Sequence, residues 1–320
     1  MARLLATVTL GAALLSGCAM KPPHPEAFTF GALGDVPYNA REEIALDALF
    51  GRIGSEPLAF IVHAGDFKAG SNAPCTDALY QDRRERLNRS PHPLILTPGD
   101  NDWTDCRRET NGSADPLERL ARVREVFFSE AWSLGARRLP VSKQEGCVER
   151  VGTGCACPGL PENQLWSKNA VVFATLHIVG SNDNRGFDAA SDAEQRCRSL
   201  ANHRWLDRAV RLAESPGQRG LVIVAQANLW LPSQQGAYDG LRRQIAEAGR
   251  RLGRPMLYIH GDTHYYRMDR PFRDASGKRI ENLRRIEIPG SPAVAWVRIL
   301  VDPNQPDLFI VEPVLAADAP

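Results

Sequence analysis

The sequence lacks an excess of charge of either sign. Its 320 residues include 39 Lys and Arg against 38 Asp and Glu, which gives a formal net charge of +1. A chain so close to neutral offers no electrostatic reason to expect a nucleic acid or a membrane surface as its partner. It also lacks internal repeats and low-complexity tracts, and 43% of its residues are hydrophobic. These properties are typical of a globular protein rather than a solenoid or a disordered chain.

Long apolar runs are also scarce, and the one that stands apart lies at the N-terminus. Residues 4–15 are apolar after an early Arg3, and Ser16-Gly17-Cys18 follows them. The run is too short to span a bilayer, and small residues at its end are typical of a secretory signal. The segment resembles a bacterial lipoprotein signal, in which Cys18 becomes the lipidated first residue. The alternatives are an ordinary cleaved signal or a membrane anchor.

The lipoprotein resemblance also carries an expected location. Ala19 directly after the cysteine is compatible with the outer membrane. Residues 19–27, which include the proline-rich KPPHPE, are expected to form a short stiff tether. We therefore expect an exported protein, anchored in the bacterial envelope and facing the periplasm, that touches the membrane only through its lipid.

The cysteine pattern suits an exported protein. Of seven cysteines, six remain after Cys18: Cys75, Cys106, Cys147, Cys155, Cys157 and Cys197. An even number in an exported chain predicts disulfides, although the sequence leaves their pairing open. Cys75 follows the Gly-Asp pair at 65–66 and Cys106 follows the one at 99–100, so one bridge between them would tie those two loops together. The other four would give two more bridges, and the alternative for the cluster at 147–157 is a zinc site.

Apolar runs alternate with amphipathic stretches along most of the chain. Strands are expected at 28–33, 60–63, 94–97, 170–179, 221–225 and 256–260, with helices at 41–50, 76–87, 116–128, 190–212 and 238–252. This alternation predicts parallel strands with helices outside them. From residue 265 onward the helical pattern stops, and 284–288, 293–301 and 307–314 look like strands of a second sheet. Residues 135–163 lack periodicity and are expected to be an inserted loop held by disulfides.

Four Gly-Asp pairs each follow one of these apolar runs. They are Gly34-Asp35, Gly65-Asp66, Gly99-Asp100 and Gly261-Asp262. The glycine allows a sharp turn and a close approach of backbone to ligand. The Asp then stands at the carboxyl end of a strand, where open α/β sheets bind ligands. His264 lies two residues after the last pair, so the pattern predicts a carboxylate cluster that binds cations.

In their order and context these motifs resemble the calcineurin-like metallophosphoesterases. That family has an Asp after the first strand, Gly-Asp after the next, then Gly-Asn-His-Asp/Glu, a His after a further strand, and Gly-His-x-His. The matching positions are Asp35, Gly65-Asp66, the GDND at 99–102, Gln226 in VIVAQAN, and the GDTH at 261–264. The GDVPY, GDND and GDTH variants look like a bacterial branch of the superfamily. The resemblance implies a four-layer α-β-β-α sandwich of two mixed sheets over residues 28–315.

The chain departs from that family pattern at four histidines. Pro37, Asn101, Gln226 and Asp262 stand where the family has His, and Asp100 stands where it has Asn. Tyr38, one residue after Pro37, could ligate or hydrogen-bond instead. The resemblance implies one metal set of Asp35, Asp66 and His264, and a second set of Asp66, Asp100, Asp262 and Gln226. Oxygen ligands suit Mn²⁺ or Mg²⁺ better than Zn²⁺, with Ca²⁺ as a further option.

The missing histidines leave the proton donor open. Asn101 holds the position of the family's leaving-group acid but cannot give up a proton near neutral pH. His63 and His260, shortly before Asp66 and Asp262, are candidate substitutes, with packed structural histidines as the alternative. Lys68 could contact phosphate or be solvated, and Asp102 and Asp105 are expected to orient the ligand loop. Ser181-Asn182-Asp183-Asn184 could line the pocket, with a polar turn as the favoured interpretation.

The function predicted from these residues is metal-dependent hydrolysis of a phosphomonoester or phosphodiester outside the cytoplasm. Two divalent cations would activate a water for attack on phosphorus, and the partner would be a small phosphate ester. The alternative is a non-catalytic lipoprotein that keeps the fold and binds metal or a phosphate ligand. A second alternative is a structural envelope protein with an empty site.

Overall fold

The computed structural model describes residues 24–234 and 236–315. The predictions for the signal segment and for lipidation at Cys18 lie outside these residues, as does most of the expected tether. In the described part, no helix combines the length and the apolar character needed to cross a membrane.

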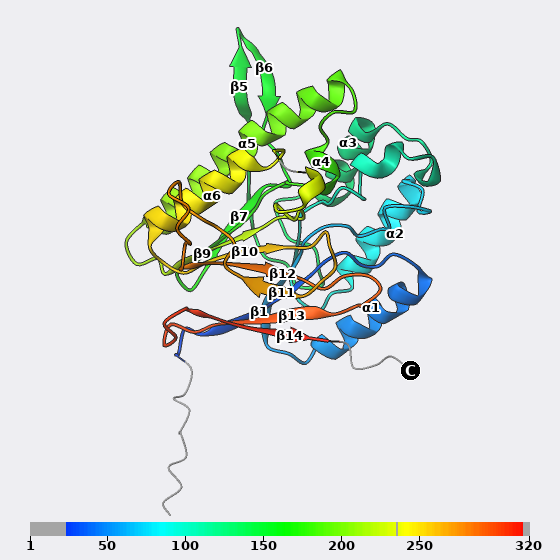
Figure 1. Ribbon diagram of the computed structural model, residues 1–320. Helices are drawn as coiled ribbons and strands as arrows, with labels where there is room; N and C mark the ends of the chain where they lie inside the picture. Colours follow the sequence, from blue (N-terminus) through cyan, green and yellow to red (C-terminus); the bar gives the residue numbers. More distant parts are fainter. Residues whose placement is uncertain (1–23, 235, 316–320) are drawn as a thin grey trace, which may run out of the picture.

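Two mixed sheets form the centre of the structure (Figure 1). The first has the order β14-β13-β1-β2-β3, with bounds Phe309–Val314, Trp296–Val301, Phe28–Leu33, Leu58–His63 and Leu94–Leu96. Strands β1, β2 and β3 are parallel, and β13 pairs antiparallel to β1. The alternating strands and helices of the N-terminal part thus give the parallel strands expected from the sequence.

The second sheet has the order β11-β12-β10-β9-β8-β7-β4. Its strands are Arg267–Asp269, Leu283–Glu287, Met256–His260, Gly220–Val224, Val171–Thr175, Gln164–Lys168 and Ser142–Lys143 in that order. The four central strands, from β12 to β8, run parallel, and they are buried at every position. Burial on both faces explains why β8, β9 and β10 are nearly continuous apolar runs in the sequence, whereas β12 buries charged side chains as well.

Helices cover the outer face of each sheet. On the first sheet lie α1 (Ala40–Ile53), α2 (Asp77–Asn88) and α3 (Pro116–Phe127), and on the second lie α5 (Ala189–Glu214) and α6 (Asp239–Leu252). Local signals fix their starts: the Asn39 side chain accepts the N–H of Glu42, and Asp115 caps α3 directly before Pro116. Short 3₁₀ turns complete the set at Thr104–Arg107, Glu109–Asn111 and Pro232–Gln234.

Three apolar layers hold the sandwich together. One lies between the sheets and includes Phe30, Phe60 and Phe173, whose rings pack edge-to-face or stack at centroid distances of 5.0–5.3 Å. The other two lie between each sheet and its helices. The predicted four-layer α-β-β-α architecture is therefore confirmed.

Two expectations about local structure are wrong. The three C-terminal strands do not form a second sheet of their own, because β12 joins β10 while β13 and β14 extend the first sheet beside β1. The expected loop at 135–163 contains a hairpin of β5 (Cys147–Val151) and β6 (Gly154–Pro158), which projects beyond the body of the molecule in Figure 1. The disulfides expected for this segment are present and hold the hairpin.

The six cysteines in the described residues form three disulfides. They pair as Cys75–Cys106, Cys147–Cys155 and Cys157–Cys197. The first is the bridge expected between the two loops, the second closes the hairpin, and the third ties the hairpin to α5. Because all four cysteines of the second cluster are paired, the zinc alternative is excluded for this arrangement.

Candidate metal centre

The six predicted metal ligands come together where strands of both sheets end. Asp35, Asp66 and Asp100 follow β1, β2 and β3, while Gln226 follows β9 and Asp262 and His264 follow β10. The two halves are joined by hydrogen bonds. The N–H of Asp262 donates to Asp35 Oδ1 at 3.0 Å, and Gln226 Nε2 donates to Asp66 Oδ2 at 3.1 Å. The order of motifs in the sequence thus predicted a true spatial cluster.

The glycine of a Gly-Asp pair allows the carboxylate of another pair to lie against its backbone. A side-chain carbon at Gly99 would lie 2.0 Å from Asp66 Oδ1, and one at Gly261 would lie 2.0 Å from Asp35 Oδ2. Each glycine therefore admits the carboxylate of a different pair. Positive φ values fall on the ligand candidates themselves: Asp35 at 54°, Asp66 at 55°, Asp262 at 77° and His264 at 64°. Left-handed backbone at non-glycine residues is costly and gathers at functional sites.

The carboxylates at these strand ends are buried without a basic partner. We call Asp35, Asp66, Asp100, Asp102 and Asp262 the strand-end carboxylates. In the described part of the chain, none of them forms an ion pair with an Arg or a Lys. Burial, together with the charge of neighbouring carboxylates, raises the pKa of Asp35 and Asp66 well above the usual range. Burial likewise raises the pKa of Asp100 to about 6 and that of Asp262 to about 8.

Some carboxylate oxygens in this cluster have no partner at all. Asp35 Oδ2 and Asp100 Oδ1 are buried and accept no hydrogen bond from any described residue. A buried, unpaired carboxylate oxygen costs free energy unless a cation or a donor satisfies it. The cluster therefore has acceptor oxygens that the described protein atoms leave unsatisfied.

His264 turns an unprotonated nitrogen toward this charge. Its Nδ1 lies 2.8 Å from the carbonyl oxygen of Ser291, which can only accept, so Nδ1 carries the proton. Burial lowers the pKa of the ring, so the neutral form is favoured and Nε2 offers a lone pair. That Nε2 lies 3.7 Å from Asp35 Oδ1. Two acceptors at this separation can share a cation about 2.1 Å from each, and a carbonyl-bound imidazole is the usual support of a metal-ligating His.

Tyr38 occupies the space beside this first ligand set. Its hydroxyl lies 3.4 Å from Asp66 Oδ2 and 3.2 Å from His264 Nε2, and it accepts a bond from Asn101 Nδ2 at 3.0 Å. Burial raises the pKa of the phenol, so the hydroxyl keeps its proton. Of the two roles considered for Tyr38, the structure thus shows the hydrogen-bonding one.

Gln226 does not present the atom that a metal ligand requires. Its Oε1 accepts the backbone N–H of Gly180 at 2.7 Å, and its Nε2 faces Asp66. An amide nitrogen donates hydrogen bonds and does not bind cations. This orientation differs from the ligand role that the family resemblance implies, because the neighbouring N–H takes the amide oxygen.

The SNDN segment both turns and lines the site. Ser181, Asn182, Asp183 and Asn184 all have positive φ, between 48° and 62°, in the left-handed turn labelled α4 (Gly180–Asp183) in Figure 1. Ser181 Oγ lies 2.8 Å from both Asp100 Oδ2 and Asp105 Oδ1. A side-chain carbon at Gly180 would lie 2.7 Å from Asp100 Oδ1. The favoured interpretation as a simple polar turn was therefore incomplete.

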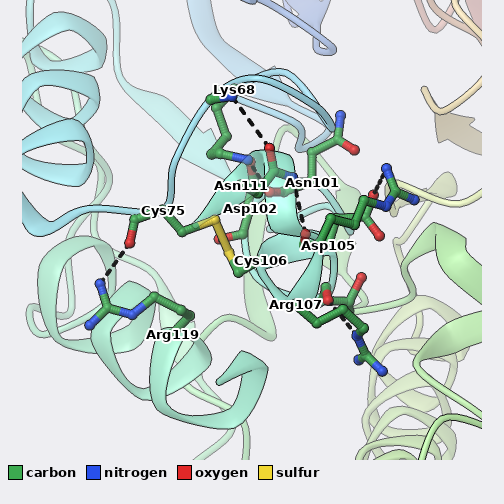
Figure 2. The surroundings of a disulfide bond; sticks show 12 residues. Lys68, Cys75, Asn101, Asp102, Asp105, Cys106, Arg107, Asn111 and Arg119 are labelled. Carbon is green, nitrogen blue, oxygen red and sulfur yellow. Dashed lines mark hydrogen bonds and ion pairs between the residues drawn. A yellow bond between two sulfur atoms is a disulfide. The ribbon is translucent and has the colours of Figure 1, made fainter. Parts of the chain in front are cut away.

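Asp102 and Lys68 hold the two ligand loops of the first sheet together (Figure 2). Asp102 accepts the N–H groups of Asp66 at 3.0 Å, Gly99 at 2.7 Å and Phe67 at 2.9 Å, which is the orienting role predicted for it. Lys68 is buried and donates to the carbonyl oxygens of Ala69 and Asn101 at 2.8 and 2.7 Å. It is therefore a structural lysine rather than a phosphate contact. The Cys75–Cys106 bridge joins the same two loops.

The two histidines considered as proton donors are packed structural residues. His63 Nε2 lies 3.1 Å from the carbonyl of Val36, and His260 Nδ1 lies 2.8 Å from that of Gly261. Both rings are fully buried, and burial lowers the pKa of His63 to about 4 and of His260 to about 3. Their strand positions point them into packing, so this geometry does not support the catalytic role predicted for them.

Sequence reasoning missed Ser291, whose carbonyl fixes the His264 tautomer. Ser291 lies in Pro289-Gly290-Ser291-Pro292, directly after a predicted strand. A Gly-Pro cluster at a strand end is the same signal that located the Gly-Asp pairs. A side-chain carbon at Gly290 would lie 2.4 Å from Asp35 Cβ, so this loop also depends on close approach.

The fit to a cation differs between the two predicted ligand sets. No group of three or more His, Cys, Asp or Glu in residues 24–234 and 236–315 is already arranged as a metal-binding set. The set of Asp35, Asp66 and His264 nevertheless has an unpartnered oxygen at Asp35 Oδ2 and an unprotonated imidazole nitrogen, which the Tyr38 hydroxyl approaches to 3.2 Å. The set of Asp66, Asp100, Asp262 and Gln226 has a donor nitrogen where a ligand is needed. The first set fits a divalent cation, and the second does not.

Comparisons with known proteins identify the fold. No family model and no curated protein matches the sequence. Among solved structures, the chain is similar to a dimetal phosphatase from Danio rerio with 11% identity and a TM-score of 0.51, covering 90% of this chain and 96% of that one. Vps29 of Cryptosporidium parvum matches at 11% identity and a TM-score of 0.32, with 91% and 99% covered, too weak a likeness to carry an argument. Identity this low speaks for architecture alone, and the chain has the two-sheet α/β fold of metallophosphoesterase-like proteins.

Proposed function

We propose that this protein hydrolyses phosphoric esters with the help of a divalent cation and acts outside the cytoplasm. The observation that carries the proposal is the set of strand-end carboxylates, which are buried and form no ion pair with an Arg or Lys in the described residues, beside the unprotonated Nε2 of His264. Buried charge of this kind needs a cation. The shared fold with a dimetal phosphatase supports the reaction class.

The residues of the site divide the work of such a reaction. Asp35, Asp66 and His264 would hold the cation, which supplies charge stabilisation to a phosphoryl group and makes water more acidic. Asn101 Nδ2 positions the Tyr38 hydroxyl, which keeps its proton and can donate to a phosphoryl oxygen. Asp102 fixes the backbone that carries Asp66. Asn101, His63 and His260 cannot supply a proton to a leaving group near neutral pH, so esters with acidic leaving groups suit this site best.

The test is turnover of a panel of phosphomonoesters and phosphodiesters by the purified protein with Mn²⁺, Mg²⁺ or Ca²⁺. We expect phosphate release that EDTA abolishes and that Asp66→Asn lowers by at least about 100-fold. Asp307→Asn, at an exposed carboxylate paired with Arg270, is the matched control and should keep full activity. Absence of turnover with every ester and cation would overturn the proposal.

The rival function is cation or phosphate binding without catalysis. It is favoured by one observation, the absence of a usable proton donor at Asn101, His63 and His260. Tight, saturable cation binding with no turnover of activated esters such as aryl phosphates would establish the rival. Turnover confined to such activated esters would instead support hydrolysis without an acid.

The location outside the cytoplasm is supported by three disulfides, which form and persist in oxidising compartments. The lipid anchor at Cys18 remains part of the proposal. Cys18→Ser should release the protein from the membrane fraction, whereas wild type should sediment with it. A wild-type protein found only in the cytoplasmic fraction would contradict this part.

A further inference from the structure

The amide of Gln226 is held in one orientation by its surroundings. The side chain is fully buried, and its Oε1 accepts the N–H of Gly180 at 2.7 Å. A backbone N–H can only donate, so the amide oxygen must face Gly180. Turning the amide over would set N–H against N–H and would leave the oxygen against carboxylates. Both changes cost free energy in a buried site.

The donor at Gly180 is itself fixed by the left-handed turn that follows it. Asp183 in that turn is bonded to the guanidinium of Arg198, and both side chains are almost fully buried. Asp183 Oδ1 also accepts the N–H of Val179, directly before Gly180. A strained turn pinned from both sides keeps the Gly180 N–H aimed at Gln226.

The two hydrogens of the Gln226 amide face the carboxylates of the second ligand set. Nε2 donates to Asp66 Oδ2 at 3.1 Å, and the same side chain lies beside the carboxyl of Asp262. The remaining member, Asp100, has one oxygen committed to Ser181 Oγ at 2.8 Å. A group with partial positive charge thus stands between two anions, where the family resemblance expects a second cation.

We propose that this centre takes one divalent cation, held by Asp35, Asp66 and His264, and that the Gln226 amide fills the second position as a hydrogen-bond donor. The inference takes from the proposed function that a divalent cation binds at this centre. It reduces the expected number of bound cations from two to one. Gln226 is a positioning residue in this scheme, because it acts on the cation through Asp66. The left-handed turn at Gly180 becomes part of the centre, since it sets the direction of the amide.

The test counts Mn²⁺ ions on the full-length protein by titration calorimetry and by electron paramagnetic resonance. Wild type should bind one Mn²⁺ per chain with a magnetically uncoupled spectrum. Gln226→Glu keeps an oxygen for Gly180 and exchanges the NH₂ for a carboxylate oxygen. It should therefore bind a second Mn²⁺ and show a spin-coupled pair. Two ions on wild type, or no gain on the variant, would overturn the proposal.

Two further variants keep the result decisive. Gln226→His offers a ligand nitrogen of the kind the family uses, so it should also gain a second ion and serves if Gln226→Glu fails to fold. Gln226→Met removes the amide without adding a ligand and should stay at one ion; a second ion on this variant counts against the proposal. Counting bound ions needs no substrate, so the two proposals can fail separately. One bound ion without turnover would contradict only the proposed hydrolysis. Turnover by wild type with two bound ions would contradict only this inference.

Discussion

Two buried charge clusters in this molecule are balanced in different ways. One lies beneath α5, where Glu162 is paired with Arg124 at 2.6 Å and where Asp183 and Glu194 share Arg198. The strand-end carboxylates form the other and have no Arg or Lys as partner in the described residues. The arginines hold the pKa of Glu162 and Glu194 below the usual range, although burial alone would raise both. Burial without such partners raises the pKa of Asp35 and Asp66.

The contrast separates buried charged groups that are paired within the protein from buried carboxyl groups that are not. The Arg-balanced cluster is complete in itself: His177 donates from Nδ1 to Glu162 at 2.7 Å and accepts from Trp103 Nε1 at 3.1 Å. Its groups leave nothing for an outside ion to satisfy. The strand-end carboxylates keep free oxygens instead, so their stability depends on what binds them. Substitutions in either cluster test this difference between them.

The largest effect should come from removing Arg198, the arginine that pairs with two carboxylates in the Arg-balanced cluster. Arg198→Met leaves Asp183 and Glu194 buried without a partner, and it should lower the free energy of unfolding by about 3–5 kcal/mol. Urea denaturation at neutral pH measures this loss. Arg196→Met, at an exposed arginine paired with Glu149, is the control and should change stability by less than about 0.5 kcal/mol. Equal effects of the two variants would remove the distinction between the clusters.

Next in size is the stabilisation of the strand-end carboxylates by a cation. At about 100 times its dissociation constant, Mn²⁺ should raise the free energy of unfolding by about 2.7 kcal/mol. Thermal unfolding with and without Mn²⁺ reads this out. Asp66→Asn should abolish the gain, whereas Arg196→Met should keep it. A wild type that Mn²⁺ leaves unchanged would mean that the cluster is balanced by other means.

The third prediction concerns pH. Glu162→Gln keeps a shape that fits Arg124 and His177 but removes the charge, and it should cost about 2 kcal/mol at pH 7. The pKa of Glu162 is lower in the folded chain than its value of 4.5 in the unfolded chain, so the unfolded chain takes up the proton first on acidification. Wild type should therefore lose this stability below about pH 4.5, and the variant should show a shallower loss.

Urea denaturation at several pH values between neutral and acid measures both slopes. Glu130→Gln, at an exposed carboxylate that pairs with Arg84 and Arg138, serves as the matched control. Equal slopes of unfolding free energy against pH for wild type and Glu162→Gln would show that the charge of Glu162 does not contribute to stability.

The smallest effect has the opposite sign. Burial raises the pKa of Asp35 above its value in the unfolded chain, so keeping this carboxyl buried costs free energy at pH 8. In EDTA, Asp35→Asn removes that cost, and it should stabilise the metal-free protein by about 1 kcal/mol. The same substitution in the balanced cluster, Asp183→Asn, should destabilise it. Chemical denaturation of both variants provides the comparison. A destabilised Asp35→Asn would show that this carboxylate is already satisfied without a cation.

The sequence predicted the positions of the candidate ligands better than the direction of their atoms. Apolar runs ending in Gly-Asp located Asp35, Asp66, Asp100 and Asp262 at one edge, because strand ends of parallel sheets meet there. The orientation of Gln226 depends on the N–H of Gly180, which is 46 residues away. The inward direction of His63 and His260 likewise follows from packing. Such contacts between distant segments leave no local pattern.

The fold shows the same division between local pattern and distant contact. Helix bounds follow from caps and amphipathic spacing, as at Asn39 and Asp115. The placement of β12 in one sheet and β13 in the other depends on which neighbour each strand finds, which alternation does not encode. The β5–β6 hairpin is short and exposed, so its stability comes from the disulfides more than from its sequence.

The bridge between Cys75 and Cys106 has a consequence for the two loops that it joins. It spans 31 residues and fastens the loops that carry Asp66 and Asp100 before any cation is present. This disulfide opposes any separation of the two loops that repulsion between their carboxylates would cause. The two loops are therefore held together by a covalent bond whether or not anything occupies the space between their carboxylates.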